Sequence, residues 1–134
     1  MKGSPDAPKF LGLRTAIYRA PDLTEAKAWY SKIFGIEPYF DQPFYVGFNV
    51  GGYELELELE LDPDPSSSDG AGGVIVYWGV SDVEVALKRL FSLGASERTN
   101  VQDVGEEIRL ATVLDPFGNV FGMIENPYFK IPST

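Results

Sequence analysis

The sequence YELELELE, residues 53–60, alternates leucine with glutamate, and the alternation continues to Leu61. Successive side chains of a β-strand point to opposite faces, so this stretch predicts a strand with one leucine face and one glutamate face. The leucines must cover an apolar layer. The glutamates face either bulk water or a wet cavity, and the alternation alone leaves this choice open.

Upstream of this stretch the sequence predicts one helix and three more strands. They are a strand at residues 10–19, a helix at residues 23–34, and strands at residues 36–40 and 44–49. Asp22 and Glu25 match a capping box at the start of the helix, and Gly35 can end it in a left-handed conformation. The order strand, helix, strand, strand, strand defines a first module at residues 10–61, after a lead-in at residues 1–9.

The same order returns after a linker at residues 62–73, which is rich in proline, serine and glycine. The predicted elements are a strand at residues 74–80, a helix at residues 83–93, and strands at residues 96–101, 107–114 and 120–125. The apolar helix positions 23, 26, 30 and 33 recur at 83, 86, 90 and 93, and Asp22 recurs as Asp82. We interpret this as an internal repeat of roughly sixty residues, which predicts an α+β fold of two tandem βαβββ modules. The second module covers residues 74–125, and residues 126–134 form a tail.

Two residue types are absent, and their absence excludes several kinds of chemistry. The chain has no cysteine and no histidine. Disulfides, thiol nucleophiles, Ser-His-Asp triads and thiolate or imidazole metal ligands are therefore excluded within it. Any metal would have to be a hard cation held by carboxylates and carbonyls.

The charge balance is strongly acidic, with twenty Asp and Glu against eleven Lys and Arg and a net charge of −9. Such a surface repels phosphate backbones and anionic lipid, so we expect neither a nucleic-acid nor a membrane partner, and it mildly favours cationic ligands. No apolar run approaches the ~20 residues of a membrane helix. The N-terminal residues lack the apolar segment of a secretory signal, and we expect a cytoplasmic protein.

Several short motifs sit at the element boundaries of both modules. They are Ala20-Pro21-Asp22-Leu23, Trp29-Tyr30 and Phe34-Gly35 in the first module, and Val80-Ser81-Asp82-Val83, Leu93-Gly94 and Asp115-Pro116-Phe117-Gly118-Asn119 in the second. On these motifs, and over roughly residues 11–125, the chain resembles the vicinal oxygen chelate superfamily. That superfamily includes glyoxalase I, extradiol dioxygenases, fosfomycin-resistance enzymes and bleomycin-resistance proteins. The resemblance implies a curved mixed sheet around a cleft, with the helices on the outer face.

The resemblance also implies where the metal ligands of this superfamily would lie. Three of the four positions are Thr15, Ile75 and Gly122, and the fourth is Glu54 or Glu56. Isoleucine and glycine have no side-chain donor and threonine is a poor ligand, so we expect a divergent member without metal or other cofactor. Glu125 does not replace the lost ligand, because its odd offset from Gly122 places it on the opposite face of its strand.

Strand parity selects the side chains that would line the cleft. The candidate ligand-binding residues are Thr15, Ile17, Arg19, Glu54, Glu56, Glu58, Ile75, Tyr77, Val120 and Gly122. This set combines aliphatic walls with an acidic row and suits a small ligand that has an apolar body and a positive group. The alternative for the glutamates is a solvated edge strand. Arg19 more simply neutralises Glu54 or Glu56, and Tyr77 more simply fills space.

Three functional hypotheses follow. The first is a metal-independent binding protein that sequesters a small cationic or amphipathic molecule, and the resemblance implies that it acts as a homodimer. The second is a glyoxalase-like lyase or isomerase, with Glu54 or Glu56 as general base and Arg19 steadying an enolate. The third is a non-catalytic dimerisation or interaction module.

Overall fold

The computed structural model describes residues 8–9, 13–60 and 74–128. The first module contains β1 (Thr15–Ala20), α1 (Leu23–Phe34), β2 (Phe40–Asp41), β3 (Tyr45–Val50) and β4 (Tyr53–Leu59). The second contains β5 (Tyr77–Gly79), α2 (Val83–Ser92), β6 (Ser96–Asp103), β7 (Arg109–Leu114) and β8 (Val120–Glu125). The predictions for residues 10–12, the linker and the end of the tail fall outside the described residues.

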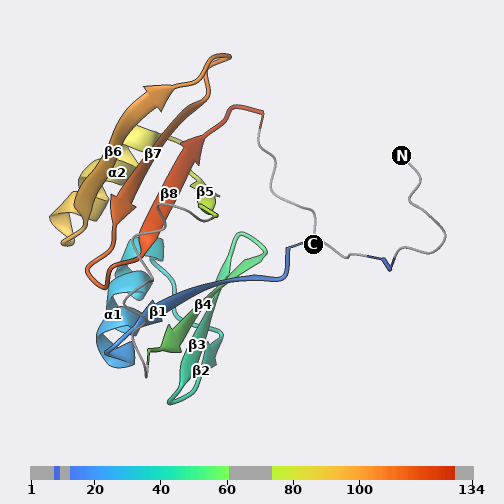
Figure 1. The fold of residues 1–134 in the computed structure, drawn as a ribbon, viewed down its shortest axis with the longest axis vertical. Helices are drawn as coiled ribbons and strands as arrows, with labels where there is room; N and C mark the ends of the chain where they lie inside the picture. The colour runs from blue at the N-terminus through green and yellow to red at the C-terminus, as the bar shows by residue number, and fades with distance from the viewer. Residues whose placement is uncertain (1–7, 10–12, 61–73, 129–134) are drawn as a thin grey trace.

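The strands form two four-stranded sheets, one in each module (Figure 1). Their orders are β1-β4-β3-β2 and β5-β8-β7-β6, so the second sheet repeats the topology of the first. In each sheet the first strand pairs in parallel with the last, and the other pairs are antiparallel. The predicted α+β fold of two tandem βαβββ modules is therefore confirmed.

Several strands differ in length from the sequence prediction: β1 begins only at Thr15, β7 begins two residues late at Arg109, and three others also differ. Strand β2 has only two residues and begins two positions after Pro38, which cannot donate to a sheet ladder. Strand β5 was expected at residues 74–80 but has three residues, because it pairs with β8 only from Tyr77 to Gly79. Strand β6 is longer than expected and runs to Asp103, with two irregularities in its register with β7.

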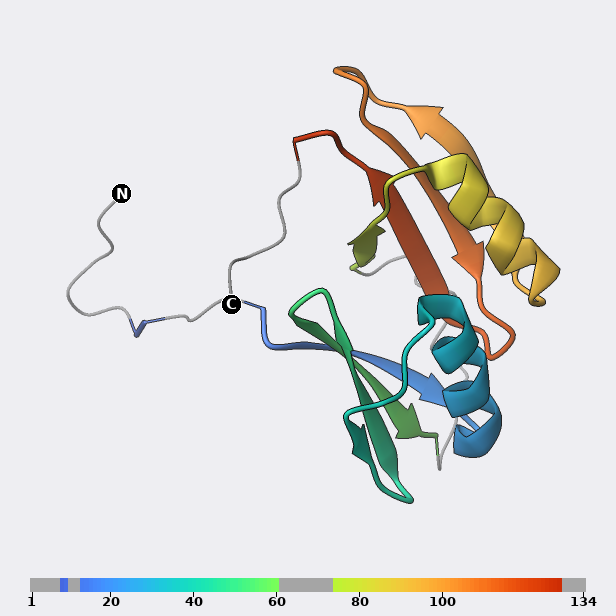
Figure 2. The ribbon, with the colours of Figure 1, turned by 180° about the vertical axis from the view of Figure 1, so that it is seen from behind.

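Both helices begin at the predicted aspartate. Asp22 Oδ1 accepts the Glu25 N–H at 2.9 Å, and Asp82 Oδ1 accepts the N–H groups of Glu84 and Val85 at 3.0 and 3.1 Å. At the end of α1, Gly35 has a φ of 66°, and its N–H donates to Ser31 O. The two helices lie on the same side of the molecule (Figure 2). No helix in the described residues is long and apolar enough to cross a membrane.

A single apolar core lies between the helices and the sheets. Leu55 and Leu57 of β4 are fully buried in it, as the alternation in residues 53–60 predicts. Aromatic rings fill the region where the modules meet, and they include Tyr18, Tyr30, Phe34, Trp78 and Phe121. The two modules therefore share one core.

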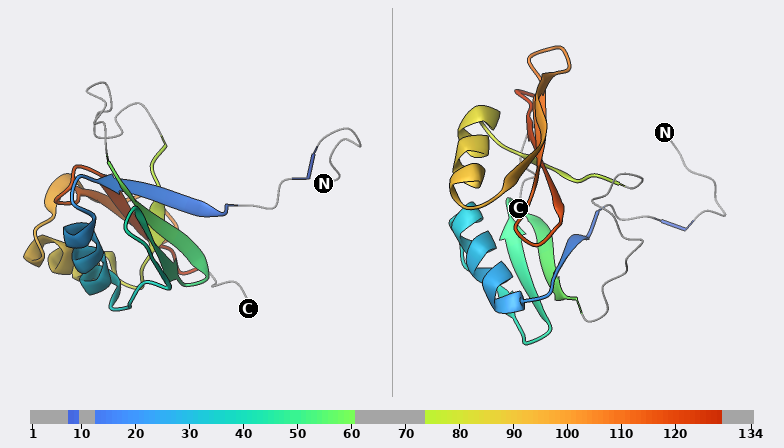
Figure 3. Two further views of the ribbon diagram at one scale, coloured as in Figure 1. Left: turned by 90° about the horizontal axis from the view of Figure 1, so that it is seen from below. Right: turned by 60° about the vertical axis from the view of Figure 1, so that its left-hand side comes forward.

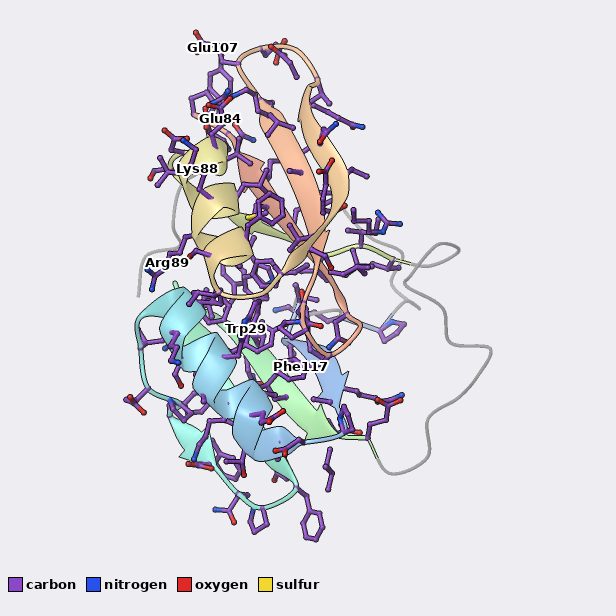
Figure 4. All side chains as sticks on the ribbon, turned by 90° about the vertical axis from the view of Figure 1, so that its left-hand side faces the viewer. Trp29, Glu84, Lys88, Arg89, Glu107 and Phe117 are labelled. Atoms are coloured by element: carbon purple, nitrogen blue, oxygen red, sulfur yellow. The ribbon has the colours of Figure 1, made fainter. Side chains whose placement is uncertain are left out.

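Trp29 closes one side of this junction. Its indole N–H donates to Leu93 O at 2.6 Å, and its ring meets the ring of Phe117 edge-on with centroids 6.2 Å apart. Figure 4 shows Trp29 and Phe117 between the two modules. From the helix period, Trp29 is predicted to lie at a rim or at an interface. In the structure it lies at the interface between the two modules.

Candidate functional site

The sheet face opposite the helices carries the predicted acidic row. Strand register pairs Thr15 with Glu54, Ile17 with Glu56 and Arg19 with Glu58. Ala16 and Tyr18 of β1 and Leu55 and Leu57 of β4, which alternate with these residues, are buried, whereas the six are half-buried or exposed. Figure 3 shows both helices on one side of the strands, so the acidic row lies on the other side. In the first module, parity therefore assigned the faces of β1 and β4 correctly.

Glu54 is held by two neighbours that sequence reasoning did not select. Arg14 Nη1 lies 3.3 Å from Glu54 Oε1, and the Tyr39 hydroxyl donates to Glu54 Oε2. The Glu54 side chain is only 12% exposed. This carboxylate is therefore already partnered by a cation and a hydroxyl group. Arg14 lies directly before β1, and Tyr39 directly before β2.

Arg19 is paired with Glu58, and not with Glu54 or Glu56 as expected. Arg19 Nε lies 3.8 Å from Glu58 Oε1, and both side chains are substantially exposed. The reason is the parallel register, which places Arg19 directly beside Glu58. The general expectation that Arg19 neutralises a glutamate of this row is correct, but the partner was wrong.

Glu56 lies at the centre of the row. In the described part of the chain no cation lies within salt-bridge distance of its carboxylate, in contrast to Glu54 and Glu58. Desolvation by burial raises the pKa of Glu56, repulsion from Glu54 and Glu58 raises it further, and Arg14 lowers it. Glu56 is thus a carboxylate whose charge a cationic ligand would stabilise.

Exposed aromatic rings border the acidic row on the side of β2 and β3. Phe40 and Tyr45 are stacked, with centroids 5.1 Å apart and planes 19° apart, and they are 37% and 41% exposed. Tyr39 is 57% exposed. Its ring lies over Gly47, since a Cβ added at Gly47 would stand 3.1 Å from Tyr39 Cε1. The sequence analysis did not select Tyr39 and Phe40. The signal that could have found them is Gly47, because a glycine that pairs with Glu56 leaves room for a neighbouring ring on that face of the sheet.

The predicted site residues of the second module lie on β8 and on or beside β5. Tyr77 pairs with Gly122 across β5 and β8, Ile75 precedes β5, and Val120 begins β8. Tyr77 is 37% exposed and covers Gly122, so it fills the space beside that glycine. Within the described residues, no hydrogen bond or ion pair joins this group to the acidic row of the first module.

The positions that hold a metal in the superfamily do not provide a metal site here. A Cβ at Gly122 would lie 2.6 Å from Val76 O and 2.7 Å from Tyr77 Cδ1, so the backbone itself leaves no room for a longer side chain. Ile75 has no donor atom, and Thr15 offers one hydroxyl. The described residues contain no group of three or more His, Cys, Asp or Glu that could hold a metal ion. This donor set does not fit a transition metal.

A cavity of about 610 Å³ lies elsewhere, at the start of α2. It is lined by Val80, Ser81, Asp103, Glu107, Arg109, Glu125, Asn126 and Pro127. None of the ten predicted ligand-binding residues lines it. Arg109 bridges Glu84 and Glu125 at 3.1 and 2.9 Å, and Glu125 Oε1 also accepts the Val83 N–H at 2.9 Å. Figure 4 shows Glu84 and Glu107 at this end of the second module.

Glu125 has a structural role in this region. Its carboxylate accepts the first free N–H of α2 and pairs with Arg109, and these two contacts lower its pKa. It therefore points to the helix side of β8, away from the face of Gly122. The prediction that Glu125 lies on the opposite face of its strand from Gly122 is therefore confirmed.

Comparison with known proteins agrees with this arrangement. The family model described as "Glyoxalase/Bleomycin resistance protein/Dioxygenase superfamily" matches residues 12–123. The chain belongs to this superfamily. A search among curated proteins finds no match.

Solved structures of superfamily members share the fold at low sequence identity. A glyoxalase-related enzyme from Fulvimarina pelagi has a TM-score of 0.73 and 19% identity, with 92% of this chain and 94% of that chain covered. Lactoylglutathione lyase from Agrobacterium tumefaciens has a TM-score of 0.64 and 21% identity, covering 92% and 100%. A fosfomycin resistance protein from Listeria monocytogenes, solved with Mn(II) and a dihydroxypropylphosphonic acid, has a TM-score of 0.68 and 15% identity, covering 90% and 94%. At these identities the likeness establishes the fold alone.

Proposed function

We propose that this superfamily member is a metal-independent binding protein that sequesters a small cationic or amphipathic molecule on its acidic sheet face. The observation that carries the proposal is the position of Glu56. It is a half-buried carboxylate between two glutamates that already have arginine partners, while no such cation is described for Glu56 itself. A cationic group would relieve the repulsion that Glu56 experiences, and the exposed side chain of Ile17 beside it supplies apolar contact.

The chemistry of the inherited metal positions supports binding without a metal. Thr15, Ile75 and Gly122 cannot supply the set of donors that a transition metal needs, and the Val76 carbonyl occupies the space beside Gly122. Binding would therefore depend on carboxylates and apolar surface. Both are present on the face of β1 and β4.

The proposal is tested with two probes of similar size, one cationic and one neutral. We expect 2-phenylethylamine, measured by calorimetry, to bind more tightly than the neutral 2-phenylethanol. The advantage should shrink at high salt, because screening weakens the attraction to Glu56. It should grow as the pH rises through the raised pKa of Glu56, because a bound cation favours the ionised carboxylate.

Glu56→Gln should remove most of the preference for the amine. Glu97→Gln is the matched control, since it changes the net charge by the same amount at an exposed position of β6 in the other module. Equal affinities for the amine and the alcohol, or an equal loss in both variants, would overturn the proposal.

A glyoxalase-like lyase or isomerase is the second candidate, because a glutamate with a raised pKa is also suited to act as a general base. Arg19 is already paired with Glu58, which weakens the hypothesis that Arg19 stabilises an enolate. Turnover of the methylglyoxal–glutathione adduct, lost in Glu56→Gln, would favour this candidate over simple sequestration.

We further propose that the protein is cytoplasmic and that it acts as a homodimer, the second of which its resemblance to the superfamily implies. A dimer would let the partner chain cover part of the acidic face. Light scattering coupled to gel filtration measures the mass directly. If the protein is a monomer and still binds the amine probe, the dimer proposal is wrong and the binding proposal stands.

A further inference from the structure

We propose that the cationic group recognised by this protein is a methylated ammonium, held beside Glu56 against the rings of Tyr39, Phe40 and Tyr45. The inference rests on the proposed function and adds the chemical class of the ligand's positive group. It also assigns three aromatic residues to the site that sequence reasoning did not include among the binding residues.

Strand register brings the acidic and aromatic side chains to one face. Gly47 pairs with Glu56 on one side and with Phe40 on the other, so the row across the sheet is Ile17, Glu56, Gly47, Phe40. Paired residues project from the same face of a sheet, and neighbouring strands are about 4.8 Å apart. Gly47 has no side chain, and the space above it, between Glu56 and Phe40, is taken by the Tyr39 ring and the Glu54 carboxylate, which lie 3.1 and 3.3 Å from where a Cβ at Gly47 would stand.

The ring of Tyr39 lies between Glu56 and Phe40. It lies over Gly47, and its hydroxyl donates a hydrogen bond to Glu54, which orients the ring. More than half of the Tyr39 side chain is exposed, so the outer face of the ring is open. An aromatic ring with an open face next to a carboxylate attracts a cation through both its quadrupole and the nearby charge.

The stacked pair of Phe40 and Tyr45 forms the wall. Tyr45 pairs with Glu58, so this wall meets the acidic row at Glu58. Together with Tyr39, the two rings make an aromatic surface that remains exposed in the described structure. Acidic side chains border it at Glu56 and Glu58, and this charge distribution selects a partner that is apolar and positive at once.

The methylated form of the cation follows from what each group can contact. A primary ammonium is strongly hydrated, and it needs hydrogen-bond acceptors for its three N–H groups. Glu54 is engaged by Arg14 and the Tyr39 hydroxyl, and Glu58 lies 3.8 Å from Arg19, so Glu56 is the carboxylate of this row for which no ion-pair partner is described. A trimethylammonium group donates no hydrogen bonds, and its methyl groups pack on ring faces while its charge remains near Glu56.

Three probes that share a phenylethyl body test the inference: trimethyl(2-phenylethyl)ammonium, 2-phenylethylamine, and (3,3-dimethylbutyl)benzene, the uncharged carbon analogue of the first. We expect the trimethylammonium probe to bind about two- to fivefold more tightly than the primary amine, the range of an exposed cation–π contact. We expect it to bind more tightly than the uncharged analogue, with a difference that shrinks at high salt. NMR titration of the intact chain provides the affinities.

Two variants and one control locate the effect. Phe40→Leu and Tyr45→Leu keep apolar bulk but remove the ring, and each should reduce the preference for the trimethylammonium probe over the primary amine. Phe91→Leu is the matched control, because Phe91 is 38% exposed but lies on α2 of the other module. It should leave the preference unchanged.

The outcomes separate this inference from the proposed function. Equal binding of the two cations, or an unchanged preference in both Leu variants, overturns the methylated-ammonium assignment while the acidic binding face stands. Absence of binding by either cation overturns the proposed function itself. Equal binding of the uncharged analogue, or a change of oligomeric mass in Phe40→Leu, would instead indicate an apolar contact surface and would also overturn the assignment.

Discussion

Tyr30 Oη donates a hydrogen bond of 2.6 Å to Asp115 Oδ2, which joins α1 of the first module to a turn of the second. Both residues are buried, Tyr30 completely. Asp115 also accepts the N–H groups of Phe117 and Asn119 and the side-chain amide of Asn119. The same amide donates to Arg19 O of β1 at 2.8 Å. The turn motif that carries the family resemblance therefore works here as a structural joint between the modules.

Removing the hydroxyl of Tyr30 should destabilise the protein. Tyr30→Phe deletes a buried hydrogen bond to a carboxylate and leaves Asp115 without one of its donors, so we expect a loss of about 1–3 kcal/mol in the free energy of unfolding. Urea denaturation measures this value. Tyr128→Phe, at a position that is 65% exposed, should change it by no more than about 0.5 kcal/mol. If both variants unfolded at the same urea concentration, the joint would not contribute to stability.

The tyrosines of the junction should also make stability fall at alkaline pH. Burial raises the pKa of Tyr18 to about 12, against the effect of the Trp78 hydrogen bond, and burial beside Asp115 raises the pKa of Tyr30 well above its ordinary value. The folded state therefore keeps protons that the unfolded chain loses above about pH 10. The stability that these groups contribute is complete below that pH and is lost as the pH rises toward 12.

Tyr18→Phe should make this alkaline decline less steep, whatever its effect at neutral pH. Equilibrium unfolding at a series of pH values from neutral to alkaline gives the slope for the wild type and for the variant. The two curves should differ mainly above pH 10. Parallel curves across the whole range would mean that Tyr18 ionises equally easily in the folded and unfolded states.

Two buried glycines should respond differently to alanine. At Gly122 a Cβ would meet the Val76 carbonyl at 2.6 Å, and backbone cannot move aside easily, so Gly122→Ala should cost about 1–3 kcal/mol of stability. At Gly47 the nearest atom is in the Tyr39 ring at 3.1 Å, and that exposed ring can shift, so Gly47→Ala should cost less. Thermal unfolding of both variants gives the comparison. A cost at Gly47 equal to that at Gly122 would contradict the distinction between backbone and side-chain neighbours.

Glu56 should lower the stability of the folded protein at neutral pH. Its raised pKa means that the folded state binds the proton more tightly than the unfolded chain does. The stabilisation from this tighter proton binding is complete below the pKa that Glu56 has in the unfolded chain. It is lost as the pH rises through the pKa of Glu56 in the folded state. Glu56→Gln should be more stable than the wild type at pH 7, by no more than about 1 kcal/mol for a partly exposed group, and the difference should vanish near pH 4. Melting temperatures at the two pH values test this, with Glu97→Gln as the control for net charge.

The order of elements could be read from sequence with little error because it depends on local patterns. Asp22, Gly35 and Asp82 cap helices through contacts within a few residues, and the helix at residues 23–34 has the bounds that were predicted. The strand at residues 120–125 was also placed correctly. Strand β5 was overestimated because its apolar composition resembles a strand over seven residues, whereas its length depends on its partner β8.

The candidate site was only partly predictable. Parity placed Glu54, Glu56 and Glu58 together because a period of two residues needs no knowledge of the partner strand. The pairing of Arg19 with Glu58, and the approach of Arg14 and Tyr39 to Glu54, depend on the register between strands that are far apart in sequence. Local pattern carries no information about that register. For the same reason the aromatic rings beside Glu56 were not selected in advance.

The sequence by itself determined the repeat of two modules and the buried leucine face and acidic glutamate face of β4, because each follows from residue type and spacing alone. Its resemblance to the superfamily implied that positions 15, 75 and 122 have lost metal-ligating side chains. Only the tertiary structure decided which glutamates have a cationic partner and which ring covers Gly47. Those contacts join residues on different strands, and their free energies depend on distances that exist only once the sheets have formed and packed against the helices.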